Sequence, residues 1–383
     1  MHPLSVTCYS KNHDASTHPQ STPFNGRLMS TTSLKRIAKF RLPSGILGAS
    51  ITDDGLWLVA ACMNGVYAVD VPRESALKIG EHRSYASSAA ILPTLQTIVT
   101  AGYDGRLQWF RKTDHSFIRQ TQVHDFWSWD LAVSPDESMI ASVTGQYLAG
   151  DYKYAPAPER EPSVRIVAAD TGEVLHSLTH VPSVQAVAFS PDNRYVAAGN
   201  LMGEVRIWNT TSGRQVRSFV TDGFTSWGIV KSHCYLGGIF ALRFTANSQH
   251  LLLAGMGPMR DPMAGNGRQR WEKWSWNQDT PHKLDETHKD ESGEGLMETL
   301  AIHPDNQRFV MGGRLRGGAW NAAVFDLESG NRLATLKTGF RITEAMFTSD
   351  GSRLILAGLK GQPSKKRRGR YPDFGRIEVY DVT

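Results

Sequence analysis

A Ser-Pro-Asp turn, or a close variant of it, recurs along the chain, and each copy lies between two short runs of β-forming residues. The clearest copies are ITDDG (51–55), VSPDES (133–138), FSPDNR (189–194), IHPDNQ (302–307) and FTSDGS (347–352). Proline presets the φ angle of a turn, and the Asp carboxylate accepts hydrogen bonds from nearby backbone N–H groups. This recurrence indicates an array of similar β units, which constrains the fold more tightly than the length of 383 residues does.

The spacing of these turns indicates that two further copies have lost the Ser-Pro-Asp sequence. The intervals from Asp54 to Asp136 and from Asp192 to Asp305 are much longer than the other two. Weaker strand-turn-strand patterns fill both intervals, at AAILPTLQTIV (89–99) and LRFTANSQHLL (242–252). Five clear copies and two weak ones predict seven units.

The fourth unit shows what one unit contains. VQAVAFSPDNRYVAAG (184–199) predicts two strands and their turn, and GEVRIWN (203–209) and RQVRSFV (214–220) predict two more. The inner strands are apolar on both faces, as Val184 and Val187 illustrate, which is typical of a sheet covered on both sides by other sheets. The sequence therefore predicts an all-β fold, a seven-bladed β-propeller of four-stranded antiparallel blades.

This pattern resembles the WD-repeat (Trp-Asp repeat) β-propeller family over residues 34–383, and FSPDNRYVAAG followed by GEVRIW is the best match. At the end of the third strand no unit carries the Trp-Asp pair, and the fourth unit has Trp208-Asn209. The resemblance implies a structural tetrad on His82, Thr100 and Asp104, with Phe110 at the usual Trp position. It places His124 and His180 at the corresponding entry positions of the third and fourth blades. It also implies an interaction scaffold without chemistry of its own.

The two ends of the chain are predicted to meet in one blade. The last segment, GRIEVYDVT (375–383), is a third strand with nothing after it, and LKRIAKFRL (34–42) precedes the first blade with the character of a fourth strand. Pairing them would close the ring and hide an open sheet edge. Residues 1–33 are rich in Ser, Thr, His and Pro, so we expect a disordered tail before a single propeller domain. Met29 is an alternative native start.

Long insertions are predicted on one face of the propeller, which we call the top face because the second-to-third strand connections and the inter-blade links share it. They are residues 145–163, 255–270, 313–321 and 358–375, together with the link 221–238. Variable loops on a rigid scaffold are where binding residues usually lie, so the sequence favours a protein-binding scaffold that uses this face. Neutral variation in loop length is the alternative.

The top-face loops of blades five, six and seven are basic, which suggests a second function. We define the basic crescent as Arg260, Arg268, Arg270, Arg314, Arg316, Lys360, Lys365, Lys366, Arg367, Arg368 and Arg370. Such a surface would attract a nucleic acid or another anion, and Trp271, Trp274, Trp276 and Tyr371 could stack on bases. The alternatives are a solvated loop, tryptophans that pack within strands, and neutralisation by an acidic link on the same face (Asp279, Asp285, Glu286, Asp290, Glu291 and Glu294).

A channel-site enzyme is the third hypothesis. Alignment of the first strands places Asp130 and Glu344 where the fourth unit has Ala186, so both are expected to face the central channel, with His124, Trp127 and Trp129 at its entrance. Two carboxylates on distant blades make no evident acid–base pair, and the histidines form no coherent zinc ligand set. We therefore predict a non-enzymatic protein with no metal and no cofactor.

Composition bears on the compartment. The three cysteines, Cys8, Cys62 and Cys234, are odd in number and widely spaced, which argues against a disulfide framework. No secretory signal and no apolar run of membrane-spanning length is evident. We expect a soluble cytoplasmic protein that does not bind membranes and is monomeric on its own. The net charge of +5 is a mild excess, so the clustering of charge matters more than its sum.

Overall fold

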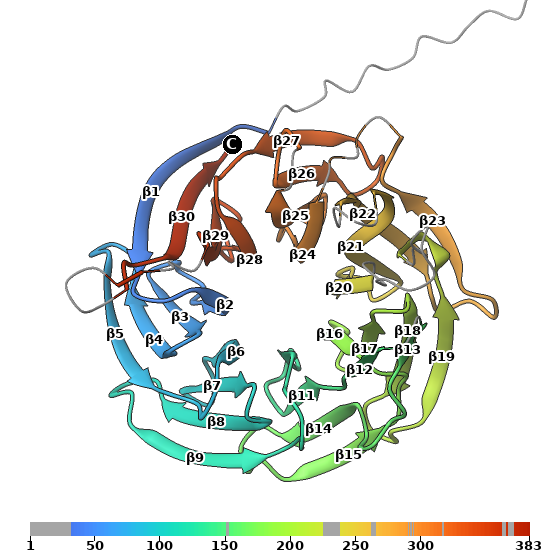
Figure 1. Cartoon of the computed structure of the whole chain (residues 1–383), viewed down its shortest axis with the longest axis horizontal. Coiled ribbons are helices and arrows are strands. Elements are labelled where there is room, and N and C mark those ends of the chain that lie inside the picture. The colour runs from blue at the N-terminus through green and yellow to red at the C-terminus, as the bar shows by residue number, and fades with distance from the viewer. Residues whose placement is uncertain are drawn as a thin grey trace, which may run out of the picture. The chain divides into compact units, whose positions relative to one another are not determined.

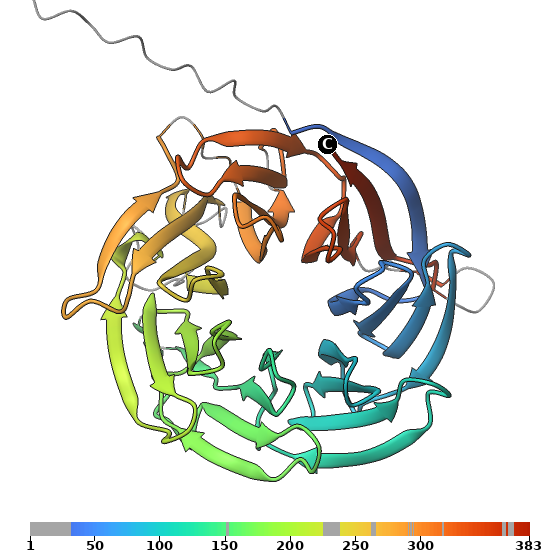
Figure 2. The ribbon, with the colours of Figure 1, turned by 180° about the vertical axis from the view of Figure 1, so that it is seen from behind.

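Seven four-stranded antiparallel sheets form a ring in the computed structural model, as the sequence predicts (Figure 1). The structure describes residues 32–383 except 151–152, 225–237, 262–265, 290, 292, 294, 316–317, 362–364 and 367–370. In each sheet the first strand lies nearest the central channel and the fourth lies at the rim, and the same arrangement is visible from behind (Figure 2).

The first four blades follow one another along the chain. Blade 1 contains β2 (Ile46–Ile51), β3 (Trp57–Cys62), β4 (Gly65–Asp70) and β5 (Ser75–Gly80). Blade 2 contains β6 (Ala86–Leu92), β7 (Thr97–Gly102), β8 (Arg106–Arg111) and β9 (Phe117–Gln122). Blade 3 contains β10 (Asp130–Val133), β11 (Met139–Val143), β14 (Val164–Ala168) and β15 (Val174–Leu178), with a separate hairpin of β12 (Tyr147–Gly150) and β13 (Lys153–Pro156). Blade 4 contains β16 (Val184–Phe189), β17 (Tyr195–Asn200), β18 (Glu204–Asn209) and β19 (Gln215–Val220).

The remaining three blades complete the ring. A short 3-10 helix, η1 (Asp222–Phe224), follows blade 4. Blade 5 contains β20 (Gly238–Phe244), β21 (His250–Asp261), β22 (Asn266–Ser275) and β23 (His282–Glu286). Blade 6 contains β24 (Gly295–Ile302), β25 (Arg308–Leu315), β26 (Ala322–Asp326) and β27 (Arg332–Leu336). Blade 7 contains β28 (Arg341–Phe347), β29 (Arg353–Leu359), β30 (Gly375–Val382) and, as its outer strand, β1 (Leu34–Leu42).

The recurring turn is held by its aspartate. In blade 7 the hydroxyl of Thr348 donates to the carboxylate of Asp350 at 2.6 Å, and the backbone N–H of Ser352 donates to it at 3.0 Å. These hydrogen bonds lower the pKa of Asp350 to about 2. The same two contacts recur around Asp136 in blade 3. The turn therefore stays closed over the whole pH range in which the carboxylate is ionised.

The two weak turns use other groups in place of the aspartate. In blade 5 the side chain of Asn247 accepts from the Thr245 hydroxyl at 2.7 Å and from the Gln249 N–H at 3.0 Å, so an amide oxygen replaces the carboxylate. In blade 2 the N–H groups of Thr94 and Leu95 donate to Glu137 of the neighbouring blade. A carboxylate from another blade thus makes the local Asp unnecessary, and this is why the repeat is hard to see there.

Neighbouring blades cover both faces of one another's inner strands. Ala186, Ala197 and Val205 of blade 4 pack against Leu242 and Leu253 of blade 5, and all five are buried. The other face of blade 4 packs on blade 3, where its residues join a second apolar cluster. Burial on both faces explains why these strands are continuously apolar instead of alternating.

The ring closes through β1, as predicted. β1 pairs antiparallel with β30, with Phe40 opposite Ile377 and Leu42 opposite Gly375. Glu378 of β30 has no exposed side-chain surface, and Lys39 at 3.0 Å and Arg36 at 3.4 Å of β1 balance its charge. The closing strand therefore contributes both apolar packing and the cations that a buried carboxylate needs.

Part of the predicted tail lies outside the described residues, namely residues 1–31, which include Met29. Residues 32 and 33 are described, and they precede β1. The N–H of Ser33 donates to the carbonyl of Thr383 at 2.6 Å, and Thr32 is buried. Among the residues that the structure describes, no helix is long and apolar enough to cross a membrane.

Deletion of residues 34–42 is expected to lower the melting temperature strongly, because it removes the outer strand of blade 7 and exposes the edge of β30. A finer test compares two substitutions in the same strand. Phe40→Ala removes a ring that is 6% exposed and should cost about 3 kcal/mol, measured by urea unfolding. Ile37→Ala, at a side chain that is 45% exposed, should cost less than about 1 kcal/mol. Equal effects of the two substitutions would contradict closure through this strand.

Candidate binding face and axial channel

An aromatic cluster lies on the top face at the mouth of the channel. We define it as Tyr85, Tyr103, Phe126, Trp127 and Trp129. The ring of Trp127 stacks between Tyr103, with ring centroids 4.6 Å apart, and Phe126, at 5.1 Å. Trp129 meets Trp127 edge to face at 5.3 Å, and Tyr85 lies 5.8 Å from Tyr103. Trp127 is nevertheless 40% exposed and Tyr85 38%, so the cluster presents apolar surface to solvent.

The insertion of blade 3 fixes the link that carries this cluster. The carboxylate of Glu161 accepts hydrogen bonds from the N–H groups of Asp125 and Phe126 at 2.9 to 3.0 Å. The hydroxyl of Thr144 donates to the carbonyl of Trp127 at 2.7 Å, and the indole N–H of Trp129 donates to the carbonyl of Gly145 at 2.8 Å. The inserted segment therefore holds the aromatic rings in place, which is a role that loop length alone does not reveal.

A second top-face cavity, of about 390 Å³, lies next to the cluster between Tyr85 and Tyr371. Asn64, Asp373 and Phe374 also line it. Tyr371 is exposed, and the ammonium of Lys366 lies 5.6 Å from the centre of its ring. Aromatic surface thus continues from the links of blades 2 and 3 to the inserted loop of blade 7.

The candidate structural histidines lie at corresponding places in three blades. In blade 2 His82 forms hydrogen bonds of 2.9 Å with both Thr100 and Asp104, and Phe110 is buried. In blade 3 His124 bonds Ser142 at 3.0 Å, with Glu161 at 3.7 Å in the place of the aspartate. Burial lowers the pKa of His124 although Glu161 opposes the shift, so this ring is neutral at pH 7.

Blade 4 departs furthest from this pattern. His180 bonds the carbonyl of Ala198 at 3.3 Å and lies against Trp208, with ring centroids 6.0 Å apart. Burial lowers its pKa to about 3, so the ring stays neutral at physiological pH. The side chain of Asn200 accepts the N–H groups of Met202 and Glu204, and the second of these corresponds to the Arg106 N–H that Asp104 accepts in blade 2.

The upper half of the channel is a polar cavity of about 290 Å³ below the aromatic cluster. Tyr103 and Trp129 line its mouth, and the ionisable residues that line it are Asp130, Arg243, Glu298, Arg341 and Glu344. The prediction that Asp130 and Glu344 face the channel is confirmed. Arg341 donates to both carboxylate oxygens of Glu298 at 2.5 to 2.8 Å, so these two charges neutralise each other.

Arg243 and Glu344 form the waist of the channel, because they also line a lower cavity of about 390 Å³. Ile51, Ile302 and Phe347 are among the other residues that line that lower cavity. Burial raises the pKa of Glu344 to about 7, and burial likewise raises the pKa of Asp130, while Arg243 opposes both shifts. Glu344 at the waist and Asp130 in the upper cavity are thus two carboxylates that are costly to ionise.

The basic crescent is only partly described. Arg316, Arg367, Arg368 and Arg370 lie outside the described residues, and Arg260 is placed in β21 by its backbone alone. Blades 5, 6 and 7 are neighbours in the ring, as predicted (Figure 1). Arg314, Lys360, Lys365 and Lys366 are exposed, whereas Arg268 and Arg270 of β22 are partly buried.

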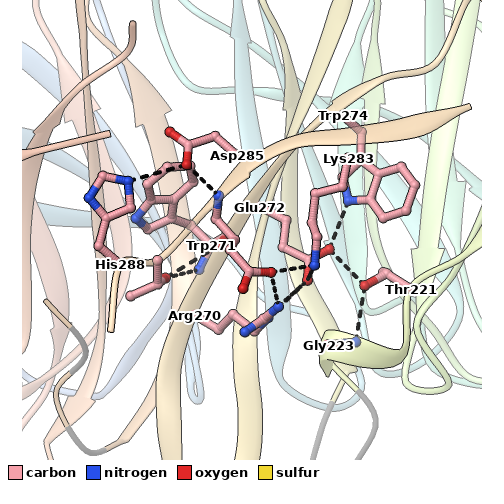
Figure 3. A network of polar contacts seen from close by, with 11 residues as sticks. Thr221, Gly223, Arg270, Trp271, Glu272, Trp274, Lys283, Asp285 and His288 are labelled. Carbon is pink, nitrogen blue, oxygen red and sulfur yellow. Dashed lines mark hydrogen bonds and ion pairs between the residues drawn. The ribbon is translucent and has the colours of Figure 1, made fainter. Parts of the chain in front are cut away.

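Arg270 is committed to a buried network within blade 5 (Figure 3). It donates to Glu272 at 2.6 and 2.9 Å and to Glu286 at 2.5 Å. Glu272, which has no exposed side-chain surface, also accepts from the Thr221 hydroxyl at 2.6 Å and from the Trp274 indole N–H at 2.7 Å. This network ties the start of the inter-blade link to β22, and a Cβ at Gly223 would collide with Glu272. Arg270 therefore stabilises the blade, which leaves it poorly placed to meet an external anion.

The tryptophans of blade 5 pack inside the protein. Trp271, Trp274 and Trp276 are at most 9% exposed, so the packing interpretation is confirmed and base stacking by these rings is excluded. The expectation that all six acidic residues form a top-face link is wrong. Asp285 and Glu286 belong to the outer strand β23, and Asp279 lies in the turn before it on the opposite face, 3.8 Å from Arg217. Asp290 and Glu294 lie outside the described residues.

Among the described residues, no group of three or more His, Cys, Asp and Glu side chains is placed to hold a metal ion. Cys62 is a free, buried cysteine, and burial raises the pKa of its thiol. Cys8 and Cys234 lie outside the described residues.

Most of the aromatic cluster was not predicted from the sequence. Trp127 and Trp129 were predicted at the channel entrance, but Tyr85, Tyr103 and Phe126 were given no weight. These residues occupy inter-blade links and a second-to-third strand turn, where small polar residues are usual. Aromatic residues recurring in such turns are the signal that could have found the cluster.

Residues 172–209 match the family model described as the WD domain, G-beta repeat. The matched segment runs from the outer strand of blade 3 through the first three strands of blade 4. It contains FSPDNRYVAAG and GEVRIW, the part of the chain that resembles the family most, and it ends with Trp208 and Asn209.

Glu344→Gln is expected to remove a pH dependence of stability. The folded-state pKa of about 7 exceeds the ordinary 4.5, so between these values the folded protein retains a proton that the unfolded chain has lost. Stability should fall as pH rises through this window, by at most about 3 kcal/mol at ~1.4 kcal/mol per pKa unit. In urea unfolding, the free energy of unfolding of the variant relative to that of the wild type should be higher at pH 8 than at pH 5. Glu81→Gln, at an exposed carboxylate on the top face, is the control and should leave the pH dependence unchanged.

Glu272→Gln is expected to destabilise blade 5 by about 2 kcal/mol, because Arg270 loses its buried counter-charge. Glu286→Gln is the matched control. Its side chain is 41% exposed and binds the same arginine, so its loss should cost less than about 1 kcal/mol in the same urea titration. A larger loss from Glu286→Gln would show that the outer ion pair, and not the buried one, holds the link.

Proposed function

We propose that this chain, which is a seven-bladed WD-repeat β-propeller, is a non-catalytic scaffold that binds a protein partner through the loops of its top face. Propellers of this family commonly mediate protein interactions. The observation that carries the proposal is the aromatic cluster at the mouth of the channel, with Trp127 stacked between two rings and still 40% exposed. Exposed, rigidly held aromatic residues are typical anchors of protein interfaces.

Two features make the face suited to a partner. The backbone that carries the aromatic rings is held by the Thr144 hydroxyl and the Glu161 carboxylate, so binding a partner would cost little conformational entropy for ordering them. The cavity between Tyr85 and Tyr371 gives the surface a depression that a partner side chain can fill. We place this function in the cytoplasm, with the propeller as a monomer until its partner binds.

A pull-down from extract of the native cells tests the proposal, with the wild-type protein compared with Trp127→Ala. We expect Trp127→Ala to lose retention of the specific partner by about tenfold or more, since loss of an interface anchor costs ~2 kcal/mol or more. The extract is treated with nuclease in a parallel arm, and retention should survive it.

Trp57→Ala is the matched control. Trp57 is 43% exposed, close to the value for Trp127, but it follows a first-to-second strand turn and so lies on the opposite face. It should leave retention unchanged. Equal loss in both variants, with melting temperatures like that of the wild type, would contradict a top-face interface.

The second candidate function is the binding of a nucleic acid or another anion by the basic crescent. Its support is the exposure of Lys360, Lys365 and Lys366 on blade 7, beside the exposed ring of Tyr371. A basic loop next to an aromatic ring suits a single-stranded nucleic acid, which offers both phosphates and bases.

Single-stranded DNA binding at two salt concentrations tests this candidate. Neutralising the KKRRGR segment at residues 365–370 should weaken binding and make it less dependent on salt. With fewer phosphate contacts, fewer counterions are released when the nucleic acid binds. Glu81→Gln serves as the top-face control and should change neither quantity. Binding that does not respond to salt, or that survives the neutralisation, removes the candidate.

A further inference from the structure

The charges in the upper channel cavity do not balance. The five side chains in it that can carry charge near neutral pH comprise three carboxylates and two guanidinium groups. Glu298 and Arg341 neutralise each other through a bidentate ion pair. Asp130 and Glu344 therefore share the single remaining cation, Arg243, and the cavity carries one excess negative charge when both are ionised.

Arg243 does not pair closely with either carboxylate. Among the described residues no ion pair within 4.0 Å joins it to Asp130 or Glu344, and its recorded hydrogen bond goes to the carbonyl of Leu242 at 2.8 Å. Asp130 is held by the Ser88 hydroxyl at 3.2 Å and the Leu131 N–H at 2.8 Å, and Glu344 by the Thr299 hydroxyl at 3.2 Å. Neutral donors thus hold both carboxylates, without a bonded counter-ion.

An unpartnered polar group in the same cavity points independently to a ligand. Ser87 lines the cavity and is 5% exposed, and its hydroxyl has no hydrogen-bond partner among the described residues. A buried hydroxyl without a partner costs free energy, so native structures usually supply one. An N–H donor that enters the cavity beside Ser87 would supply the missing partner.

The size and position of the cavity limit what can enter. A volume of about 290 Å³ is at the small end of ligand sites and fits one side chain or a small amine. Tyr103 and Trp129 line its mouth and belong to the aromatic cluster, so a partner on the top face would lie over the opening.

We propose that the upper channel cavity binds a single organic cation, a guanidinium or alkylammonium group, which a protein partner on the top face inserts as an arginine or lysine side chain. A free small amine carries the same chemistry and is the alternative source. The inference rests on the proposed scaffold function for the source of the cation, but the cation chemistry follows from the cavity itself.

The site predicts a dependence on pH, because the cation competes with the proton on Glu344. The groups that face Glu344 are Arg243 of β20, Asp130 of β10 and Thr299 of β24, with the Glu298–Arg341 pair in the same cavity. Its pKa of about 7 means that raising the pH from 6 to 8 converts most of the neutral form to the carboxylate. Affinity for the cation should therefore rise over that interval.

Calorimetric titration with capped amino acids tests the chemistry directly on the full-length protein. The probes are N-acetyl-arginine methylamide, its lysine counterpart, and the citrulline analogue as the neutral control of the same shape. We expect an arginine or lysine probe to bind at least ~10-fold more tightly than citrulline at pH 8, in keeping with one charge-assisted contact. The glutamate analogue should not bind. No preference for the cationic probes, or binding of the glutamate analogue, would overturn the proposal.

Two variants locate the cation. Glu344→Gln should weaken binding of the cationic probe by about tenfold and abolish its rise between pH 6 and pH 8, and Asp130→Asn gives a second test should the first variant fold poorly. Glu81→Gln removes one exposed carboxylate from the same face outside the cavity and should leave the affinity unchanged.

Partner retention then separates the two sources of the cation. Loss of both probe binding and partner retention in Glu344→Gln supports a partner side chain. Loss of probe binding with normal partner retention overturns that source and assigns the cavity to a free amine such as agmatine, which is titrated in parallel. Loss of partner retention in Trp127→Ala alone bears on the scaffold function. The cation chemistry of the cavity is then decided by the titrations with the capped amino acids.

Discussion

Burial of both faces of every inner strand is the constraint on which the rest of the structure depends. A strand such as β17, with Val196, Ala197 and Ala198 all buried, must have an apolar neighbour on each side. Only a closed ring gives every sheet two neighbours, and only a complete last blade closes it. The chain meets this requirement with β1, whose Lys39 and Arg36 also neutralise the buried Glu378 of β30. Closure therefore depends on ion pairs as well as on apolar packing. The cations of β1 match the buried carboxylate of β30, so this strand is suited to pair with that strand.

The same ring determines the electrostatics of the channel. The first strands of all the blades line one central channel. Side chains far apart in the sequence, such as Asp130 and Glu344, therefore face one shared and partly desolvated space. Each of them alone would be an unremarkable carboxylate on a strand. Burial in this shared space raises the pKa of both, and the charge of Asp130 raises the pKa of Glu344 further. The neighbouring Glu298 and Arg341 already neutralise each other. The unusual pKa of Glu344 is thus a property of the closed ring and not of its local sequence.

The sequence was sufficient to predict the number of blades, the strand order and the strand that closes the ring. These follow from turn chemistry and apolar patterning, both of which act over a few residues. Even the weak turns at Thr94 and Asn247 were located, although the contacts that replace the aspartate, one from a neighbouring blade, were not predictable. The channel position of Asp130 and Glu344 was also predicted by alignment of first strands, because register within a repeat is fixed.

Contacts between blades were the part that sequence could not supply. From the sequence, Arg270 is interpreted as a surface cation of a basic loop. In the structure it pairs with the fully buried Glu272, two residues along the same strand. Side chains two apart on a strand point to the same face, so this pairing is allowed by local geometry, yet nothing local says that the face is covered by the link from blade 4. The aromatic cluster has the same origin, since its rings come from two links and a turn that only the ring brings together.

The two halves of the top face consequently differ in how they can bind. Over blades 2 and 3 the rings of Tyr103 and Trp127 are packed against one another and held by the inserted segment through Glu161, so that region is ordered before any partner arrives. Over blade 7 the described lysines of the inserted loop, Lys360, Lys365 and Lys366, are exposed, and Lys366 contacts the ring of Tyr371. An ordered apolar surface contributes affinity through burial, whereas exposed charge mainly accelerates encounter and selects the sign of the partner. A partner that is basic where it meets the channel and acidic where it meets blade 7 would complement both halves at once, and this is the charge pattern that the proposed channel site and the proposed basic crescent together predict.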